Sequence, residues 1–329
     1  MTLTALKNPA DQLLAYRDAF NNAIPTGTVY KIAGLYDPID YLMQLGGKRI
    51  RPAMVLAAAE AFGASQEKAM DVALAVETFH NFTLMHDDIM DKAPLRRGMP
   101  TVHEKWNANT AILSGDAMLV QAYQHLSKSD PAQLPELMKL FNHTAIEVCE
   151  GQQLDMEFET RDNVTVDEYM EMIELKTSVL LAAALKMGAI IAGASEEDQA
   201  KIYSYGIKVG LAFQLQDDYL DAFGDPEKFG KQVGGDILAD KKTFLYLMCQ
   251  DLASAEQLKS LKSFHGVVSE EKVAVVKDLF ESTGASAIAK KEMNDYYNEA
   301  LSLVDELNCS EEGKLLFRFL AEMVLVRTT

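Results

Sequence analysis

Two aspartate clusters of the same form constrain this chain more than any other feature of its sequence. They are Asp87-Asp88-Ile89-Met90-Asp91 and Asp217-Asp218-Tyr219-Leu220-Asp221. Residues i and i+4 of an α-helix lie on one face, a single turn apart, so the first and last carboxylates of each cluster are expected to project together. An apolar run precedes each cluster, which places the carboxylates at the edge of a core rather than on a solvated face.

Carboxylates gathered in this way indicate a bound cation. Buried like charges raise each other's pKa unless a positive charge neutralises them. If the two clusters face each other, they form an all-oxygen site for a hard divalent ion. Mg²⁺ is the expected cofactor because proteins hold it with a few carboxylates, together with substrate phosphates and water.

The composition indicates a globular, acidic protein. The chain has 329 residues, 48% of them hydrophobic, and 31 basic against 49 acidic side chains give a formal charge of -18. This charge argues against nucleic acid and against electrostatic attachment to anionic lipid. Three widely spaced cysteines indicate reduced thiols and a cytoplasmic protein. Met1–Pro9 has no signal-peptide pattern, and the apolar stretch Val179–Ala194 is short and carries Lys186, so no membrane anchor is expected.

Helical periodicity dominates the chain. Apolar residues recur at three- and four-residue steps, and alternating β-type runs are nearly absent. Because no linker or low-complexity tract divides the chain, residues 1–329 are expected to form one all-α domain. The ranges with helical periodicity are Pro52–Phe62, Lys68–Asp91, Asn109–Leu126, Pro135–Glu159, Val166–Ala192, Glu196–Phe223, Leu238–Leu252, Glu270–Phe280 and Ala285–Leu307.

Basic residues gather beside glycines at three places, although the chain is acidic overall. Arginine binds phosphate oxygens bidentately, and glycine lets the backbone approach a ligand closely. Acidic clusters flanked by basic loops are therefore typical of a site for Mg²⁺ and a polyphosphate. The basic residues are Lys48, Arg49 and Arg51 in Gly46-Gly47-Lys48-Arg49-Ile50-Arg51-Pro52, Arg96 and Arg97 after the first aspartate cluster, and Lys231, Lys241 and Lys242 after the second.

Each of these features has an ordinary explanation when it is taken alone. A single DDxxD sequence is often a solvated helix face. Arg96 and Arg97 alone would form a surface turn, and His80 alone would be a hydrogen-bonded core histidine. Lys176, in a long apolar helix, could merely extend its amine to solvent. Two clusters, each followed by a basic glycine loop, favour metal and phosphate binding, whereas His86 receives no role beyond supporting the cluster.

The motifs together resemble those of the trans-prenyltransferases, the polyprenyl diphosphate synthase family of class I isoprenoid synthases. The resemblance runs from about Asp37 to Leu247, and the C-terminal third has no comparable motif. It rests on the two aspartate clusters and on Gly46-Gly47-Lys48-Arg49-Ile50-Arg51-Pro52, Phe79-His80-Asn81, Leu95-Arg96-Arg97-Gly98, Glu150-Gly151-Gln152, Lys176-Thr177 and Phe213-Gln214-Leu215-Gln216.

The resemblance implies an orthogonal helical bundle around a central cavity, usually as a homodimer. It also implies the Mg²⁺-dependent, head-to-tail addition of isopentenyl diphosphate to an allylic diphosphate, which is dimethylallyl, geranyl or farnesyl diphosphate. The allylic cation needs a dry cavity, or water would capture it. No side chain is evident as the base for the final proton loss, so the departing diphosphate is the hypothetical acceptor.

The resemblance also assigns roles to individual residues. Asp87, Asp91 and Asp217 would bind Mg²⁺, with Asp88, Asp218 and Asp221 as further or water-mediated ligands. Arg96 would contact the allylic diphosphate, helped by Lys176, Lys231 and Lys241. Isopentenyl diphosphate would be held by Lys48, Arg51, His80 and Arg97. Thr177 and Gln214 would face the developing carbocation, and they would form the catalytic set together with Arg96 and Lys176.

Residues before the first cluster would set the product length. Thr83 lies one turn before Asp87 and is small, whereas Phe82 lies roughly 7.5 Å and Phe79 roughly 12 Å deeper along a helix. Both rings would otherwise be ordinary core. An aromatic residue five positions before an uninterrupted cluster resembles the short-chain pattern that stops at geranylgeranyl diphosphate, which we therefore favour over farnesyl diphosphate.

Three other functions have to be weighed. A class I terpene cyclase would share the first cluster, but it would carry a different second metal motif and would lack the site around Lys48 to Arg51. A non-catalytic subunit of a heteromeric synthase should have lost one cluster, and here both are intact. A purely structural helical scaffold would not need carboxylates at the apolar ends of helices.

Overall fold

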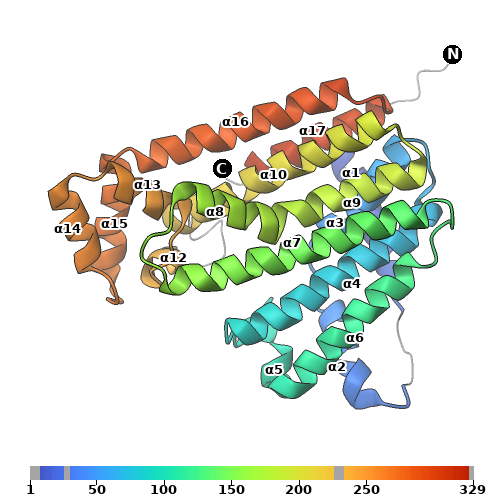
Figure 1. The fold of residues 1–329 in the computed structure, drawn as a ribbon, viewed down its shortest axis with the longest axis horizontal. Helices are drawn as coiled ribbons and strands as arrows, with labels where there is room; N and C mark the ends of the chain where they lie inside the picture. The colour runs from blue at the N-terminus through green and yellow to red at the C-terminus, as the bar shows by residue number, and fades with distance from the viewer. Residues whose placement is uncertain (1–7, 26–29, 226–232, 326–329) are drawn as a thin grey trace. The chain divides into compact units, whose positions relative to one another are not determined.

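The computed structural model describes residues 8–25, 30–225 and 233–325, and the drawn chain is almost entirely helical (Figure 1). Within these ranges, strand structure is confined to one short antiparallel hairpin, β1 (Leu95–Arg96) and β2 (Met99–Pro100). The predicted all-α class is therefore confirmed. The helices are α1 (Pro9–Ala23), α2 (Ala33–Gln44), α3 (Ile50–Ala61), α4 (Gln66–Met90), α5 (Val102–Lys105), α6 (Ala108–Leu126), α7 (Leu134–Thr160), α8 (Val166–Ile173), the π-helix η1 (Glu174–Ser178), α9 (Val179–Ala192), α10 (Glu196–Phe223), α12 (Gly235–Leu238), α13 (Phe244–Leu252), α14 (Ala255–Ser263), α15 (Glu270–Ser282), α16 (Ala285–Glu306) and α17 (Glu311–Leu325).

The described residues group into two compact units. The first unit takes its residues from Met1–Asn142, Ala183–Ala200 and Asn308–Leu316. The second unit takes them from His143–Ala182, Lys201–Leu307 and Phe317–Thr329. The first aspartate cluster belongs to the first unit and the second cluster to the second unit.

In the first unit, α4 is the central helix. It packs against α6 and α3, and its residues from Val72 to Val76 are almost completely buried. A helix that is apolar on all sides in this way is expected to run through a core. Its C-terminal end places Asp87 and Asp88 at the edge of that core, where Asp87 is half-buried and Asp88 is still buried. Gly188 lets the backbone of α9 approach α3 closely, because a Cβ atom at this position would lie only 2.3 Å from the carbonyl oxygen of Val55.

In the second unit, small residues bring α10 against the π-helix η1 and the start of α9. A Cβ atom on Gly206 would lie 2.4 Å from the Cα atom of Ala182, and one on Gly210 would lie 2.6 Å from the side chain of Ser178. This close approach places Lys176 and Thr177 of η1 beside α10, which carries the second aspartate cluster. Single-turn π-helices inside α-helices are frequent at functional sites.

Most predicted helices are confirmed to within a few residues, but the predicted helix Leu238–Leu252 is wrong over its first part. The chain leaves the helical conformation after α12, because Asp240 has a left-handed backbone with φ 54°. A new helix, α13, starts only after Thr243, whose hydroxyl accepts the N–H of Tyr246 as an N-cap. The helices α1, α2, α5, α14 and α17, and α12 except for Leu238, were not among the predicted ranges.

One helical run of the described residues, Val166–Ala192, is long and apolar enough to cross a membrane by length and composition. In this structure 72% of its most apolar window is buried inside the protein. That burial agrees with the prediction of a core helix over Val179–Ala194 rather than a membrane span.

Candidate active site

The first aspartate cluster closes the C-terminal end of α4. Arg96, from β1, donates from Nε to Asp88 Oδ1 at 2.7 Å and from Nη2 to Asp87 Oδ2 at 3.3 Å. Carboxylates at the negative end of a helix dipole are unfavourable without a nearby positive charge. Arg96 supplies that charge here, so the structure brings together three of the residues that the sequence predicts for the allylic diphosphate and its metal.

Asp88 still has acceptor capacity that no protein group uses. Its Oδ2 is buried and accepts no hydrogen bond from the described residues. Burial raises the pKa of the Asp88 carboxyl, although the Arg96 guanidinium acts in the opposite direction. A buried carboxylate oxygen without a partner costs free energy, and a cation near it would remove that cost.

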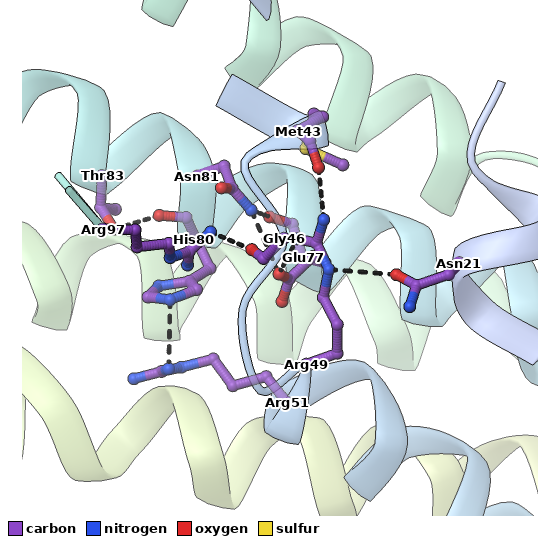
Figure 2. Close-up of polar contacts among 10 residues, drawn as sticks. All are labelled: Asn21, Met43, Gly46, Arg49, Arg51, Glu77, His80, Asn81, Thr83 and Arg97. Atoms are coloured by element: carbon purple, nitrogen blue, oxygen red, sulfur yellow. Dashed lines mark hydrogen bonds and ion pairs between the residues drawn. The ribbon is translucent and has the colours of Figure 1, made fainter. Parts of the chain in front are cut away.

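Arg51, Arg97 and His80 form a basic face (Figure 2). The charge of Arg96, which binds the first cluster, also acts on His80. Arg51 Nη1 lies 3.2 Å from His80 Nε2, and Arg97 donates to the carbonyl oxygen of Gly46. A Cβ atom on Gly47 would lie 2.8 Å from the Arg97 guanidinium carbon, so only glycine allows this contact. All four predicted isopentenyl diphosphate residues therefore lie on the loop from Gly46 to Arg51 or against it. Lys48, in the loop itself, is exposed.

His80 is a neutral member of this basic face. Burial lowers the pKa of His80 well below its ordinary value, and the charges of Arg51 and Arg97 lower it further. The ring is therefore uncharged at neutral pH and can accept a hydrogen bond from Arg51. Positive charge that lowers a histidine pKa in this way also attracts an anion.

We expect His80→Gln to reduce the loss of stability that acid causes. Unfolded His80 binds a proton near its ordinary pKa of 6.5, whereas the native ring stays neutral. Below that pH the unfolded state therefore binds more protons, and the free energy of unfolding falls by up to about 1.4 kcal/mol per pH unit. Urea denaturation of both proteins from about pH 7.5 to about pH 5 would measure this difference. Parallel pH profiles would contradict the prediction.

Two phenylalanines before the first cluster differ in burial. Phe79 is 1% exposed, and its ring centroid lies 5.2 Å from that of Phe141 and 5.6 Å from that of Phe82. Phe82 is half-buried and also meets the edge of His86, 4.8 Å between centroids. The ring of His86 lies against Gly115 of α6, where a Cβ atom would be only 2.3 Å from it. Phe79 thus behaves as core, whereas Phe82 has a partly accessible ring.

Thr83 does not present a free hydroxyl at this end of α4. Its Oγ1 donates to the carbonyl oxygen of His80 at 2.8 Å, and its side chain is half-buried (Figure 2). Such a bond to the preceding turn satisfies the hydroxyl locally. The residue thus contributes little volume one turn before Asp87, in agreement with the prediction of a small residue there.

In the second unit, Asp218 and Asp221 are held by different partners. Tyr169 of α8 donates its hydroxyl to Asp218 Oδ2, and the backbone N–H of Asp236 donates to Asp221 Oδ2 at 2.9 Å. Burial raises the pKa of Asp218 to about 8, and the charges of Asp236 and Asp217 contribute to the rise. Burial and Asp236 also raise the pKa of Asp221. Burial and neighbouring carboxylates therefore oppose ionisation of Asp218 and Asp221, and a bound cation would favour it.

The residues predicted to surround the reacting carbons lie together in the second unit. Thr177 Oγ1 lies 3.5 Å from Gln214 Oε1, and Lys176 Nζ forms an ion pair with Asp155 Oδ2 at 2.6 Å. Gly151 permits this arrangement, because a Cβ atom there would lie 2.3 Å from the backbone nitrogen of Lys176.

The two lysines predicted in the loop after the second cluster have different outcomes. Lys241 Nζ lies 3.5 Å from Asp236 Oδ1, and its side chain is 65% exposed. It is therefore beside the acidic residues and accessible to a ligand. Lys231 lies outside the described residues.

A comparison with known protein families identifies the family of this chain. The model of the polyprenyl synthetase family matches residues 32–283, a span that includes both aspartate clusters and the basic loops. The chain belongs to this family.

Individual synthases are similar over nearly the whole chain. A geranylgeranyl diphosphate synthase from Methanosarcina mazei is 41% identical over 88% of this chain and 89% of its own length. A crystal structure of a geranylgeranyl pyrophosphate synthase is 47% identical, covers 99% of this chain and all of its own, and has a TM-score of 0.88. A Corynebacterium glutamicum geranylgeranyl pyrophosphate synthase, crystallised with isoprenyl diphosphate and magnesium, is 29% identical over 97% of both chains, with a TM-score of 0.81. The chain is thus a prenyltransferase with the isoprenoid synthase fold.

The carboxylates of this synthase suit a metal that takes few protein ligands. No three carboxylate, histidine or cysteine side chains converge on one point among the residues that the structure describes. A structural zinc site would need such a closed set. Mg²⁺ instead keeps several waters and binds through one or two carboxylates plus substrate phosphates. The all-oxygen donors, the unused Asp88 oxygen and the raised pKa values of Asp218 and Asp221 therefore fit Mg²⁺.

Several residues of the synthase site were not predicted from the sequence. They are Glu77 and Asn81, which hold the basic loop, Asp155, which pairs with Lys176, and Tyr169 and Asp236, which contact the second cluster. Two of them had a local signal: Glu77 directly follows the apolar run Ala73–Val76, and Asp236 directly follows the glycine pair Gly234-Gly235.

Proposed function

We propose that the protein is a Mg²⁺-dependent geranylgeranyl diphosphate synthase, which adds isopentenyl diphosphate to an allylic diphosphate. The observation that carries this proposal is the separate basic face of Arg51, His80 and Arg97 next to an aspartate cluster that already has its own arginine. Two such places suit two diphosphates. The names of the similar synthases support the same reaction.

The allylic diphosphate would be bound through both aspartate clusters. Asp87, Asp91 and Asp217 would hold Mg²⁺, with Asp88, Asp218 and Asp221 as further or water-mediated ligands. When bound, Mg²⁺ stabilises the negative charge that collects on the leaving diphosphate. Arg96, Lys176, Lys231 and Lys241 would stabilise the same charge from the protein side.

Isopentenyl diphosphate would take the basic face of Lys48, Arg51, His80 and Arg97. Neutral His80 suits this role because its ring can donate one N–H to a phosphate oxygen while it accepts from Arg51. Thr177 and Gln214 would turn oxygen dipoles toward the carbocation without attacking it. The departing diphosphate would accept the final proton, because the neutral histidine of this face, His80, is already paired with Arg51.

The requirement for two substrates tests the reaction. Purified protein with Mg²⁺ should release pyrophosphate only when isopentenyl diphosphate and an allylic primer are both present. Release from the allylic diphosphate alone would indicate a terpene cyclase. No release with dimethylallyl, geranyl or farnesyl diphosphate would leave a non-catalytic subunit as the remaining function. Thermal stabilisation by Mg²⁺ and pyrophosphate would then separate such a subunit from a scaffold.

We also propose that the protein is a cytoplasmic homodimer, with residues 1–329 acting as one synthase domain. The exposed side chains of Leu113 and Val120 on α6, seven residues apart, form an apolar stripe along two turns, and Ile112 lies beside them. A second copy of the chain is the expected partner, because an exposed apolar stripe of this kind is typical of an interface.

We expect Val120→Glu to convert the dimer into a monomer, because a charge in an apolar interface is costly to bury. Sedimentation velocity would give the mass of each form. Val268→Glu, at an exposed valine between α14 and α15, is the matched control and should remain dimeric. A wild-type monomer, or a Val120→Glu dimer of unchanged affinity, would contradict this interface.

A further inference from the structure

The loop before α3 has a backbone that its sequence alone does not favour. Gly46, Gly47 and Arg49 have φ values of 75°, 126° and 50°. Glycine adopts such values freely, but for an arginine the left-handed conformation costs free energy. The surrounding structure must therefore hold Arg49 in place.

Arg49 is held by a buried network of hydrogen bonds (Figure 2). Its Nη1 donates to Glu77 Oε1 at 2.6 Å, its Nη2 to the carbonyl oxygen of Met43, and its Nε to Asn21 Oδ1 at 3.3 Å. The side chains of Arg49 and Glu77 are only 2% and 3% exposed. A buried ion pair with this many hydrogen bonds fixes both side chains in one geometry.

The acidic partner of this network lies on the same helix as His80. Asn81 Nδ2 donates to Glu77 Oε1 at 3.2 Å and to the Glu77 carbonyl oxygen at 2.8 Å, so the carboxylate is itself oriented. Glu77 and Asn81 are one turn apart on α4, and His80 comes between them in sequence. One short stretch of α4 therefore anchors the loop and also supplies a residue of the basic face.

Arg49, which holds the loop, is more buried than the loop residues that could contact a ligand. Arg49 is buried, whereas Lys48 is exposed and Arg51 is half-buried. Arg51 reaches His80, and Arg97 donates to Gly46 at the start of the same loop. The position of Arg49 thus sets where the neighbouring cations lie.

We propose that Arg49 and Glu77 form a positioning pair for the isopentenyl diphosphate site. Neither residue would touch the substrate; the pair would hold the loop so that Lys48, Arg51 and His80 meet one diphosphate. This inference rests on the proposed function, because it takes isopentenyl diphosphate as the ligand of the basic face.

Steady-state kinetics of Arg49→Lys test the pair. Lysine keeps the positive charge but lacks the planar guanidinium, whose N–H groups donate to Glu77, Met43 and Asn21 at the same time. We expect the KM for isopentenyl diphosphate to rise at least about tenfold, because small misplacements of binding groups have effects of that size. The KM for the allylic diphosphate should stay within about twofold, since its predicted residues lie outside this network.

Two further variants keep the test decisive if Arg49→Lys folds poorly. The double variant Arg49→Gln with Glu77→Gln removes the ion pair without leaving one buried charge alone, and it should show the same selective rise. Tyr16→Phe is the matched control. It removes a partly buried hydrogen bond to Glu60 in the same unit, so it should lower Tm without changing either KM.

An equal rise of both KM values, or unchanged KM values with a lower Tm, would show that the pair only stabilises the fold. That result would overturn this inference while wild-type elongation left the proposed function standing. A wild-type protein that does not elongate any primer would instead overturn the proposed function, and this inference with it.

Discussion

Replacing Asp87 with asparagine is expected to lower kcat/KM for elongation by about 10³-fold or more. Asparagine has the same shape, but it removes one negative charge from the first aspartate cluster and one anionic oxygen that Mg²⁺ would use. The same change leaves Arg96 with an ion pair to Asp88 alone. Initial rates at saturating Mg²⁺ measure the loss.

The control for this change is an aspartate outside the site. Asp18 on α1 pairs with Arg17 and is 63% exposed, so Asp18→Asn should leave kcat/KM within about twofold, as exposed pairs contribute little. Thermal denaturation of both variants separates catalysis from folding. If Asp87→Asn kept more than about a tenth of the wild-type rate, Asp87 would not be a ligand of the metal in the reaction.

Replacing Phe82 with alanine is expected to lengthen the product beyond twenty carbons. The ring is half-buried and lies against Phe79 and His86, so its removal opens space about 7.5 Å along α4 from Asp87. The growing chain can occupy this space if it runs beside α4. Mass spectrometry of the products would show their length distribution.

Phe141→Ala is the matched control for Phe82. Its ring packs in the same aromatic group, through Phe79 and Tyr123, but it comes from α7. Its loss should lower stability by about 3–5 kcal/mol without changing product length. An unchanged product from Phe82→Ala would show that another residue forms the floor of the cavity.

Site residues that belong to a local sequence pattern could be predicted from the sequence. The spacing within each aspartate cluster predicted its carboxylates on one helix. The second cluster lies on α10 as expected, whereas α4 carries Asp87 and Asp88 and ends with Asp91 as its C-cap. The glycine loops identified Arg51 and Arg97, which do lie close to His80 or to the loop itself.

Residues that act only through tertiary contacts could not be predicted in this way. Glu77 is one acidic residue in an apolar run, and nothing local shows that its partner is Arg49, 28 positions earlier. Asp155 meets Lys176 only because Gly151 lets two backbones approach. The wrong prediction of a helix start at Leu238 has a similar cause. Lys272, buried in α15, forms an ion pair with Asp240 at 2.6 Å, and the left-handed backbone of Asp240 ends the helical conformation there.

The most direct test of the proposed synthase is the mass of its product. Wild-type protein would receive isopentenyl diphosphate and Mg²⁺ with dimethylallyl, geranyl or farnesyl diphosphate in separate reactions. We expect a twenty-carbon diphosphate as the dominant final product from each primer. A fifteen-carbon end product would keep the elongation reaction but contradict the geranylgeranyl assignment. No product longer than any primer would contradict prenyl elongation itself.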